Sequence, residues 1–477
     1  MIQTNYIVAI ELSSSKVTGA VGIETINGIK IIATASALVD GYISKGVVRN
    51  VDKTSEAIAD IINRLEHDLT DNDGKEITIK RAYVSLAGLT MHSIQSKVTR
   101  TFDTYTKISA ETISEMELEN DALFQVPDGY SKVHVITQEY KVDGKTDHNP
   151  IGAPAMAIEG RYLNIVIKKQ FLEQLNESFE QVDTVITDSF VAACMDADIL
   201  LTKDARRNGC ALVNIGAETT TVSIYNNDNL RMLKVLPLGS NNITRDLCAE
   251  QISYDTAEVI KITRGYKSQA SETEPISNET ANNIIRARTG EILQNVRFQI
   301  EESGEMIHNV IFTGGGSRLK NLSILLEEYL PNFNTSIVSD PQLAFECKPG
   351  VNTYGIFTTA LYGLLNHGKE NCCEETSNEP QPTTLFPENI MSGNDTTEED
   401  TTTIANEEEE ARREEEQRKK KEEEDRKKRE EELKKKKKKE KEQALLNKIR
   451  GFGGLFKEFL QDATSEDEDD DINNEDD

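Results

Sequence analysis

The stretch VIFTGGGSRLKNL (310–322) joins an apolar, β-branched run to three glycines and then to a leucine-rich segment. Leu319, Leu322, Leu325 and Leu326 recur at spacings of three and four, so the stretch predicts a strand, a glycine turn and a helix. Glycine lets the backbone approach a bound group closely, and the amides that begin a helix favour negative or electron-rich groups. By itself such a stretch is more often an ordinary turn, so its meaning depends on similar turns elsewhere in the chain.

Two hydroxyl-rich turns precede it, and each lies between two β-branched runs. They are ELSSSK (11–16) and NIGAETTT (214–221). Hydroxyl and amide donors on two facing turns could clamp a di- or triphosphate. Each turn belongs to a plan of three strands and a helix, which suggests an internal duplication, although two unrelated β-meanders would give the same pattern. The strands are expected at 6–12, 16–23 and 29–38, then at 210–216, 220–226 and 230–239, and the helices at 51–69, with Asp52 or Thr54 as N-cap, and near 243–252.

The order of the three turns resembles that of the actin/Hsp70/sugar-kinase superfamily, namely phosphate-1 loop, phosphate-2 loop and adenosine loop. Within it the sequence most resembles the FtsA family of bacterial cell-division proteins, from residue 6 to about residue 365. The resemblance implies an α/β, actin-like two-lobed fold of duplicated RNase H-like halves, with ATP between the lobes. It is carried by DGYISKGVVRNVDKTSEAI (40–58), YVSLAGLTMHSIQSKV (83–98), VITQEYKVDGKTDHNPIGAPAMAIEGRYLNIVI (135–167), LPLGSNNITRDL (236–247), AEVIKITRG (257–265) and IIRARTGEIL (284–293).

The segment 82–161 distinguishes this family from the rest of the superfamily. It corresponds to the inserted subdomain 1C, which takes part in protein contacts, and neither chaperones nor sugar kinases carry residues like PIGAPAMAIEG (150–160) there. The resemblance implies subdomain 1A at 1–81, 162–200 and 345–368, 1C at 82–161, 2A at 201–240 and 303–344, and 2B at 241–302.

The resemblance also implies nucleotide-binding residues. Ser13, Ser14, Ser15, Lys16, Gly216, Thr219 and Thr220 would meet the phosphates, Gly314, Gly315, Gly316 and Arg318 would surround the adenosine, and Glu258 and Lys261 would lie beside the ribose or adenine. From the residues alone, Glu258 and Lys261 fit a solvated helix pair equally well.

Three departures from the superfamily pattern concern magnesium. Glu11 stands where an Asp is usual, Asn214 stands where an acid is usual, and Glu218 adds a negative charge near the phosphates unless its side chain turns away. Mg²⁺ needs hard oxygen ligands, and a neutral amide holds cation charge less well than a carboxylate. We therefore expect the chain to bind ATP together with Mg²⁺, with the ion held at Glu11 and Asn214. Hydrolysis of the bound ATP is expected to be slow or absent, and no catalytic residue is expected.

Composition narrows the remaining possibilities. A net charge of -29 argues against nucleic acid as a partner. The six cysteines show no CxxC pairing, which favours reduced thiols; Cys372–Cys373 is read as a linker pair, with redox activity or acylation as alternatives. The N-terminal residues lack the pattern of a signal peptide, and no window reaches the ~20 apolar residues of a membrane span.

Order is expected to end at Gly368. Residues 369–406 have the composition of a disordered linker, 407–443 form a partly helical Glu/Lys/Arg spacer, and 461–477 form an acidic tail. Between them ALLNKIRGFGGLFKEFL (444–460) predicts an amphipathic helix that lies in a membrane interface, with docking on the body or on another protein as the alternative. The lipid-facing stripe and its cations are Leu445, Lys448, Ile449, Arg450, Phe452, Phe456, Lys457, Phe459 and Leu460.

The resemblance implies an FtsA-like adaptor that polymerises and tethers FtsZ filaments to the cytoplasmic side of the inner membrane at the division site. Its partners would be the FtsZ C-terminal peptide, further copies of itself, anionic phospholipid and other division proteins. The peptide would dock on 241–302, where Arg288 could pair with its acids; Arg286, Arg297 or a structural role for Arg288 are alternatives. Two other functions remain open, a PilM-like pilus-assembly adaptor and a sugar- or acetate-type kinase.

Overall fold

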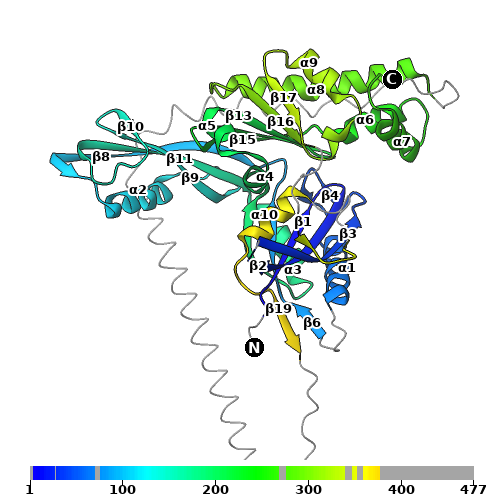
Figure 1. Cartoon of the computed structure of the whole chain (residues 1–477), viewed down its shortest axis with the longest axis horizontal. Helices are drawn as coiled ribbons and strands as arrows, with labels where there is room; N and C mark the ends of the chain where they lie inside the picture. The colour runs from blue at the N-terminus through cyan, green and yellow to red at the C-terminus, as the bar shows by residue number, and fades with distance from the viewer. Residues whose placement is uncertain are drawn as a thin grey trace, which may run out of the picture. The chain divides into compact units, whose positions relative to one another are not determined.

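The computed structural model describes residues 4–26, 28–69, 76–267, 276–338, 346–351 and 358–376 (Figure 1). The predicted spacer, the membrane-interface helix and the acidic tail lie outside these residues, as does most of the predicted linker.

The first lobe is built on a six-stranded sheet whose order is β12-β7-β1-β2-β3-β18. β1 (Tyr6–Leu12), β2 (Lys16–Thr25) and β3 (Gly28–Leu38) form the predicted antiparallel meander, and β7 (Arg81–Leu86) and β12 (Val185–Val191) continue it in parallel. The short strand β18 (Glu346–Cys347) pairs with β3. Ile7 to Ile10 are at most 1% exposed, because helices cover both faces of this sheet.

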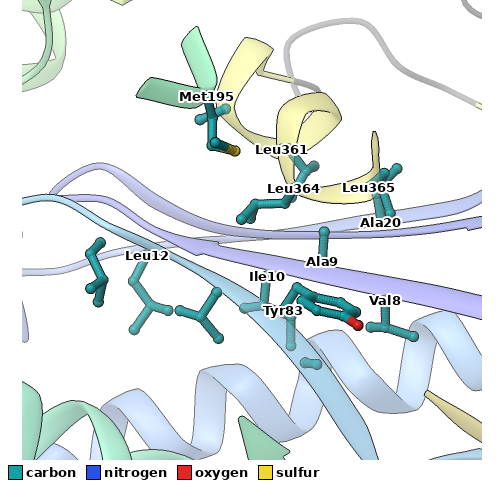
Figure 2. Close-up of a cluster of buried hydrophobic side chains, with 14 of the residues drawn as sticks. Val8, Ala9, Ile10, Leu12, Ala20, Tyr83, Met195, Leu361, Leu364 and Leu365 are labelled. Atoms are coloured by element: carbon teal, nitrogen blue, oxygen red, sulfur yellow. The ribbon is translucent and has the colours of Figure 1, made fainter. Parts of the chain in front are cut away.

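Glycines set how closely these helices approach. A Cβ on Gly19 would meet Ile61 of α1 (Val51–Leu69), and a Cβ on Gly22 would approach Leu365 of α10 (Thr359–His367). Figure 2 shows Leu364 of α10 above Ala9 of β1 and Leu365 beside Ala20 of β2. Met195 of α4 (Ala192–Leu200) lies beside the same helix, because a Cβ on Gly363 of α10 would meet it. The apolar residues of α1 and α10 recur at helical spacing, so the buried face of each helix follows from its sequence.

The second lobe repeats the plan, which confirms the predicted duplication. β13 (Cys210–Ile215), β14 (Thr220–Asn226) and β15 (Asn229–Leu236) form a meander, followed by α6 (Ser240–Cys248). β16 (Asn309–Thr313) pairs in parallel with β13, and β17 (Asn334–Ile337) with β16. The remaining helices here are α5 (Lys203–Asn208), α7 (Tyr254–Arg264), α8 (Asn278–Glu302), the 3-10 turn η1 (Gly315–Arg318) and α9 (Leu322–Tyr329).

The insertion forms an antiparallel sheet with one helix against it (Figure 1). Its elements are β8 (His92–Lys107), α2 (Ala110–Leu123), β9 (Tyr130–Val142), β10 (Lys145–Asp147) and β11 (Pro154–Lys168), and α3 (Lys169–Glu180) follows it. The predicted start at residue 82 is wrong, because it falls inside β7, which pairs with β1 and β12 in the first lobe. The insertion therefore begins after Leu86.

The prediction that order ends at Gly368 is also wrong. After α10 the chain continues through β19 (Cys373–Thr376), which pairs antiparallel with β6 (Glu76–Ile79). Cys372 and Cys373 are 1% and 4% exposed and belong to the core of the first lobe, so they are not a linker pair. The polar composition after Gly368 concealed this short strand, since strand pairing depends on a partner far away in sequence.

The expected N-cap of α1 is also corrected. Asp52 and Thr54 lie inside the helix, and the backbone N–H of Lys53 donates instead to Oδ1 of Asn50, at 2.9 Å. Asparagine is among the preferred capping residues because its short side chain reaches this N–H.

Candidate functional site

The first turn (13–16) closes between β1 and β2. The N–H of Ser13 donates to the carbonyl of Lys16 at 3.0 Å, and its hydroxyl donates to the same oxygen at 2.8 Å. Burial lowers the pKa of Lys16, opposed by nearby Glu11 and reinforced by the charge of Arg318. Because Arg318 belongs to the third turn, the structure brings the predicted phosphate-1 and adenosine turns within electrostatic reach of each other.

The second turn (216–219) packs against the start of α6. The N–H of Gly216 donates to the carbonyl of Thr219 at 2.8 Å, and the N–H groups of Ser240 and Asn241 donate to the carbonyls of Gly216 and Ala217. Thr220 is buried and its hydroxyl donates to the carbonyl of Leu238, which gives it a structural role.

The third turn (314–318) requires two of its three glycines. Gly314 has φ +89°, and a Cβ there would lie 2.3 Å from Oδ1 of Asn214. A Cβ on Gly316 would lie 2.3 Å from Cγ2 of Ile215, whereas Gly315 faces open space. The turn therefore lies tightly on the end of β13 and keeps one face open, a geometry that fits the approach of a nucleoside.

A hairpin formed by β4 (Ile43–Ser44) and β5 (Val47–Val48) joins the first two turns. The N–H of Gly46 donates to the Ser14 hydroxyl at 2.8 Å. The N–H of Lys45 and the Ser44 hydroxyl donate to Oε2 of Glu218, at 2.7 and 2.9 Å. The predicted phosphate turns, which are about two hundred residues apart in sequence, thus meet across the tip of one hairpin.

The two predicted magnesium positions flank an acid that the sequence reasoning missed. Asp196 of α4 is 2% exposed; it accepts a hydrogen bond from the side-chain amide of Asn214 at 2.8 Å and another from the Thr359 hydroxyl. Glu11 accepts a hydrogen bond from the Thr358 hydroxyl. The signal that could have identified Asp196 is its place as an acid in the otherwise largely apolar run AACMDADIL (192–200).

Burial is the main cause of raised pKa values at both acids. It raises the pKa of Asp196 despite its hydrogen bonds with Thr359 and Asn214, and it raises the pKa of Glu11, to which the charge of Asp196 adds. Within the described part of the chain no group of three or more His, Cys, Asp or Glu side chains could hold a metal ion by itself. Mg²⁺ commonly takes only one or two protein ligands together with water and phosphate, so this pair of acids remains compatible with it.

Glu258 and Lys261 are not a solvated pair. The ammonium of Lys261, whose side chain is 8% exposed, lies 2.7 Å from Glu258 and donates to the Thr244 hydroxyl at 2.9 Å. That hydroxyl donates in turn to Glu258. Since Thr244 is on α6 and the charged pair is on α7, this network fixes the two helices beside the second turn.

Arg288 is engaged within the chain. Its guanidinium makes two contacts with Asp246 and a third with Glu291 at 2.7 Å, and these acids raise its pKa. A partner's carboxylate would have to compete with both. Arg286 pairs with Glu328 and Arg297 with Glu301.

A cavity of about 620 Å³ lies away from the three turns, between the insertion sheet and the β14–β15 hairpin. Gln95, Gln138, Arg161 and Arg231 are among its lining residues, and none of the predicted nucleotide residues is.

Two duplicated meanders with clustered turns, together with an inserted sheet subdomain, define an actin-like, two-lobed protein. A model of the family "Cell division protein FtsA" matches residues 211–345, and a model of the "SHS2 domain inserted in FTSA" matches residues 88–166. The chain belongs to the FtsA family.

Relatives in several bacteria agree with this assignment. The cell division protein FtsA of Porphyromonas gingivalis is 29% identical over 60% of this chain and 63% of that protein, just under two thirds of its length. FtsA of Bacillus subtilis is 26% identical over 68% of this chain and 77% of its own length. FtsA of Escherichia coli K12 is 23% identical over 76% of this chain and 90% of its own length.

Among solved structures, a chain of the PilM–PilN type IV pilus biogenesis complex has a TM-score of 0.56 and 16% identity, covering 75% of this chain and 97% of that one. This likeness shows a shared fold and does not favour the pilus-adaptor alternative over the FtsA family. None of the helices in the described part of the chain combines the length and apolar character that crossing a bilayer requires.

Proposed function

We propose that this chain is an adaptor of bacterial cell division that binds ATP with Mg²⁺ between its lobes, assembles with further copies of itself and links FtsZ to the membrane. The observation that carries the nucleotide part is the convergence of the three turns. Ser14 and Glu218 meet at one hairpin, and burial, reinforced by the charge of Arg318, lowers the pKa of Lys16.

The residues present fit a nucleotide. The amides and hydroxyls of turns 13–16 and 216–219 would bind the phosphates, and the open face at Gly315 would admit the adenosine. Glu11 and the oxygen of Asn214 would hold Mg²⁺, with Asp196 close behind them, and the ion would neutralise phosphate charge. We expect slow or absent hydrolysis, because the amide of Asn214 polarises water less than a carboxylate would.

Calorimetric titration of the whole chain with Mg·ATP tests this proposal. The Lys16→Ala variant should bind at least about tenfold more weakly, since it loses a cation beside the phosphates. Lys30→Ala is the matched control, because Lys30 lies on the neighbouring strand and pairs with Glu346 on the surface. A chain that does not bind ATP, or equal losses in both variants, would contradict the proposal.

The membrane part depends on residues 444–460 and is tested with vesicles. Full-length protein should sediment with vesicles of anionic phospholipid, and a chain ending at Asn406 should not, because a short amphipathic helix with flanking cations binds such surfaces. A single weak anchor binds reversibly, so retention should increase at concentrations where the chain self-associates. Equal sedimentation of both chains would exclude the anchor.

The FtsZ part is tested with the C-terminal peptide of FtsZ. We propose that this peptide docks on the α6–α8 region and competes for Arg288 with Asp246 and Glu291. Arg288→Ala should weaken capture of the peptide more than Arg297→Ala, which removes the more exposed of the two side chains. Unchanged capture by both variants would place the peptide elsewhere.

A further inference from the structure

Glu218 spans the two lobes from the middle of the second turn. Its Oε2 accepts hydrogen bonds from the Lys45 N–H and the Ser44 hydroxyl of the first lobe, at 2.7 and 2.9 Å. Its Oε1 accepts one from the guanidinium of Arg245, on α6, also at 2.7 Å. The side chain is only 12% exposed, so this carboxylate is held in one place by three donors.

These donors are those expected of an anion site. A backbone N–H, a hydroxyl and a guanidinium converge on one oxyanion, which is how proteins bind phosphate oxygens. Here the anion is the chain's own carboxylate, and it lies in the turn predicted to contact the phosphates. The tip of the same hairpin also contacts the first turn, because the N–H of Gly46 donates to the hydroxyl of Ser14.

The terminal phosphate of a triphosphate would therefore meet the negative charge of Glu218. The donors that could bind this phosphate, from Ser44, Lys45 and Arg245, already donate to Glu218. A diphosphate places fewer charges near Glu218 than a triphosphate does, and like charges a few ångströms apart repel strongly at a partly buried site. The cost of displacing the Glu218 carboxylate falls mainly on the terminal phosphate.

We propose that Glu218 determines the phosphate specificity of the cleft: its carboxylate occupies the anion position of a terminal phosphate, so that the cleft favours a nucleoside diphosphate over the triphosphate. This inference rests on the proposed nucleotide function. It adds that a triphosphate binds by displacing Glu218 from Ser44 and Lys45, which releases the 43–48 hairpin from the second lobe.

The test is calorimetric titration of the full-length chain and its Glu218→Gln variant with Mg·ADP and Mg·ATP. Removing the charge should improve ATP affinity about tenfold and change ADP affinity little, so that the ratio of the two dissociation constants shifts. Glu250→Gln is the matched control, because it removes one acid from an exposed position after α6 and should leave the ratio unchanged. Arg245→Gln should shift the ratio in the opposite direction, since it removes a cation that offsets Glu218.

Amide hydrogen exchange across residues 43–48 gives a second readout that does not depend on affinity. Exchange there should rise in Glu218→Gln and in the wild-type chain with ATP, but little with ADP. If both nucleotides bind and the ratio is the same in wild type and Glu218→Gln, the specificity role is wrong while the nucleotide function stands. If neither chain binds either nucleotide, both the proposed nucleotide function and this inference are wrong. ATP binding gained only in the variant supports both.

Discussion

Asp196 shows how one residue can connect the two lobes. It belongs to α4 of the first lobe, yet it accepts hydrogen bonds from Asn214 of β13 and from Thr359 at the start of α10. Asn214, whose side-chain amide donates to Asp196, stands where the superfamily usually has an acid. The carboxylate missing at position 214 is thus replaced by a buried one next to it, whose neutral form the surroundings favour.

The raised pKa of Asp196 predicts a pH dependence of stability. Because its folded pKa lies above the unfolded value of about 3.9, the folded state binds the proton more tightly. Its contribution to the free energy of unfolding is therefore fully present below pH 3.9 and is lost as pH rises through the folded pKa. Asp196→Asn should flatten this loss, measured as the change in urea midpoint between pH 5 and pH 8.

Asp228→Asn is the control for that measurement. Asp228 is exposed in the β14–β15 turn with φ +65°, a conformation that asparagine also tolerates. The wild-type chain and Asp228→Asn should keep the same pH slope. If Asp196→Asn also keeps it, the buried carboxylate is not the source of the slope.

At the scale of elements, β19 shows that the folded body includes residues beyond α10. The N–H of Cys372 donates to the carbonyl of Tyr6 on β1, and the N–H groups of Lys80 and Arg81 both donate to the carbonyl of Cys372. Cys373 lies opposite Ile79 in the β19–β6 pair. This strand secures the chain to the first lobe before residue 377, where the chain leaves the described residues.

Truncation should reveal the contribution of β19. A chain ending at Gly368 should be less stable than one ending at Thr376 by on the order of 3 kcal/mol, because it loses two buried side chains and the hydrogen bonds of Cys372. The measurement is the free energy of unfolding in urea. Equal stability of the two chains would mean that β19 does not contribute to the fold.

The two buried thiols should also be chemically inert. Burial raises the pKa of Cys372 to about 11 and that of Cys373 to about 12, so at pH 8 both remain protonated. Iodoacetamide should label them in the folded chain far more slowly than the half-buried Cys248, and at the same rate once the chain is unfolded in urea. Fast labelling of Cys372 or Cys373 in the folded chain would favour the redox or acylation alternative.

At the scale of the whole described body, the insertion and the second lobe share one sheet. Its order is β10-β9-β11-β8-β15-β14-β13-β16-β17, and β8 joins β15 through the single pair His92–Lys234. Ser93 reinforces this junction through two hydrogen bonds with the backbone of Leu233. Its hydroxyl accepts from the Leu233 N–H at 2.8 Å and donates to the Leu233 carbonyl at 3.4 Å. A movement of the insertion would therefore be transmitted to the meander that carries the second turn.

Ser93→Ala should weaken this coupling. Loss of the hydroxyl leaves the Leu233 N–H without its acceptor and should cost about 1–2 kcal/mol of unfolding free energy. Hydrogen exchange at Leu233 should rise, whereas Ser131→Ala on β9, which β11 separates from β8 in the same sheet, should leave it unchanged. Unaltered exchange at Leu233 in Ser93→Ala would show that the backbone pair alone holds the junction.

Much of the fold could be predicted from sequence because its signals are local. Period-two and period-three-to-four patterns gave both meanders, α1 and the strand–turn–helix at 310–322, and glycine and hydroxyl turns marked where the strands end. The contacts that define the site could not be predicted in this way. Ser44 and Glu218 are 174 positions apart, and Asp196 meets Thr359 across 163.

The amino-acid sequence by itself indicated the duplicated plan and the set of turns, since these follow from short-range pattern and residue type, and it indicated the family through the resemblance of its motifs. Only the tertiary structure decided where the side chains point: that Glu218 binds the 43–48 hairpin, that Asn214 meets a buried acid, that Arg288 is already paired, and that Cys372 and Cys373 are core residues. The physical reason is that burial and hydrogen-bond partners come from residues distant in the chain, whereas backbone propensity and periodicity come from neighbours.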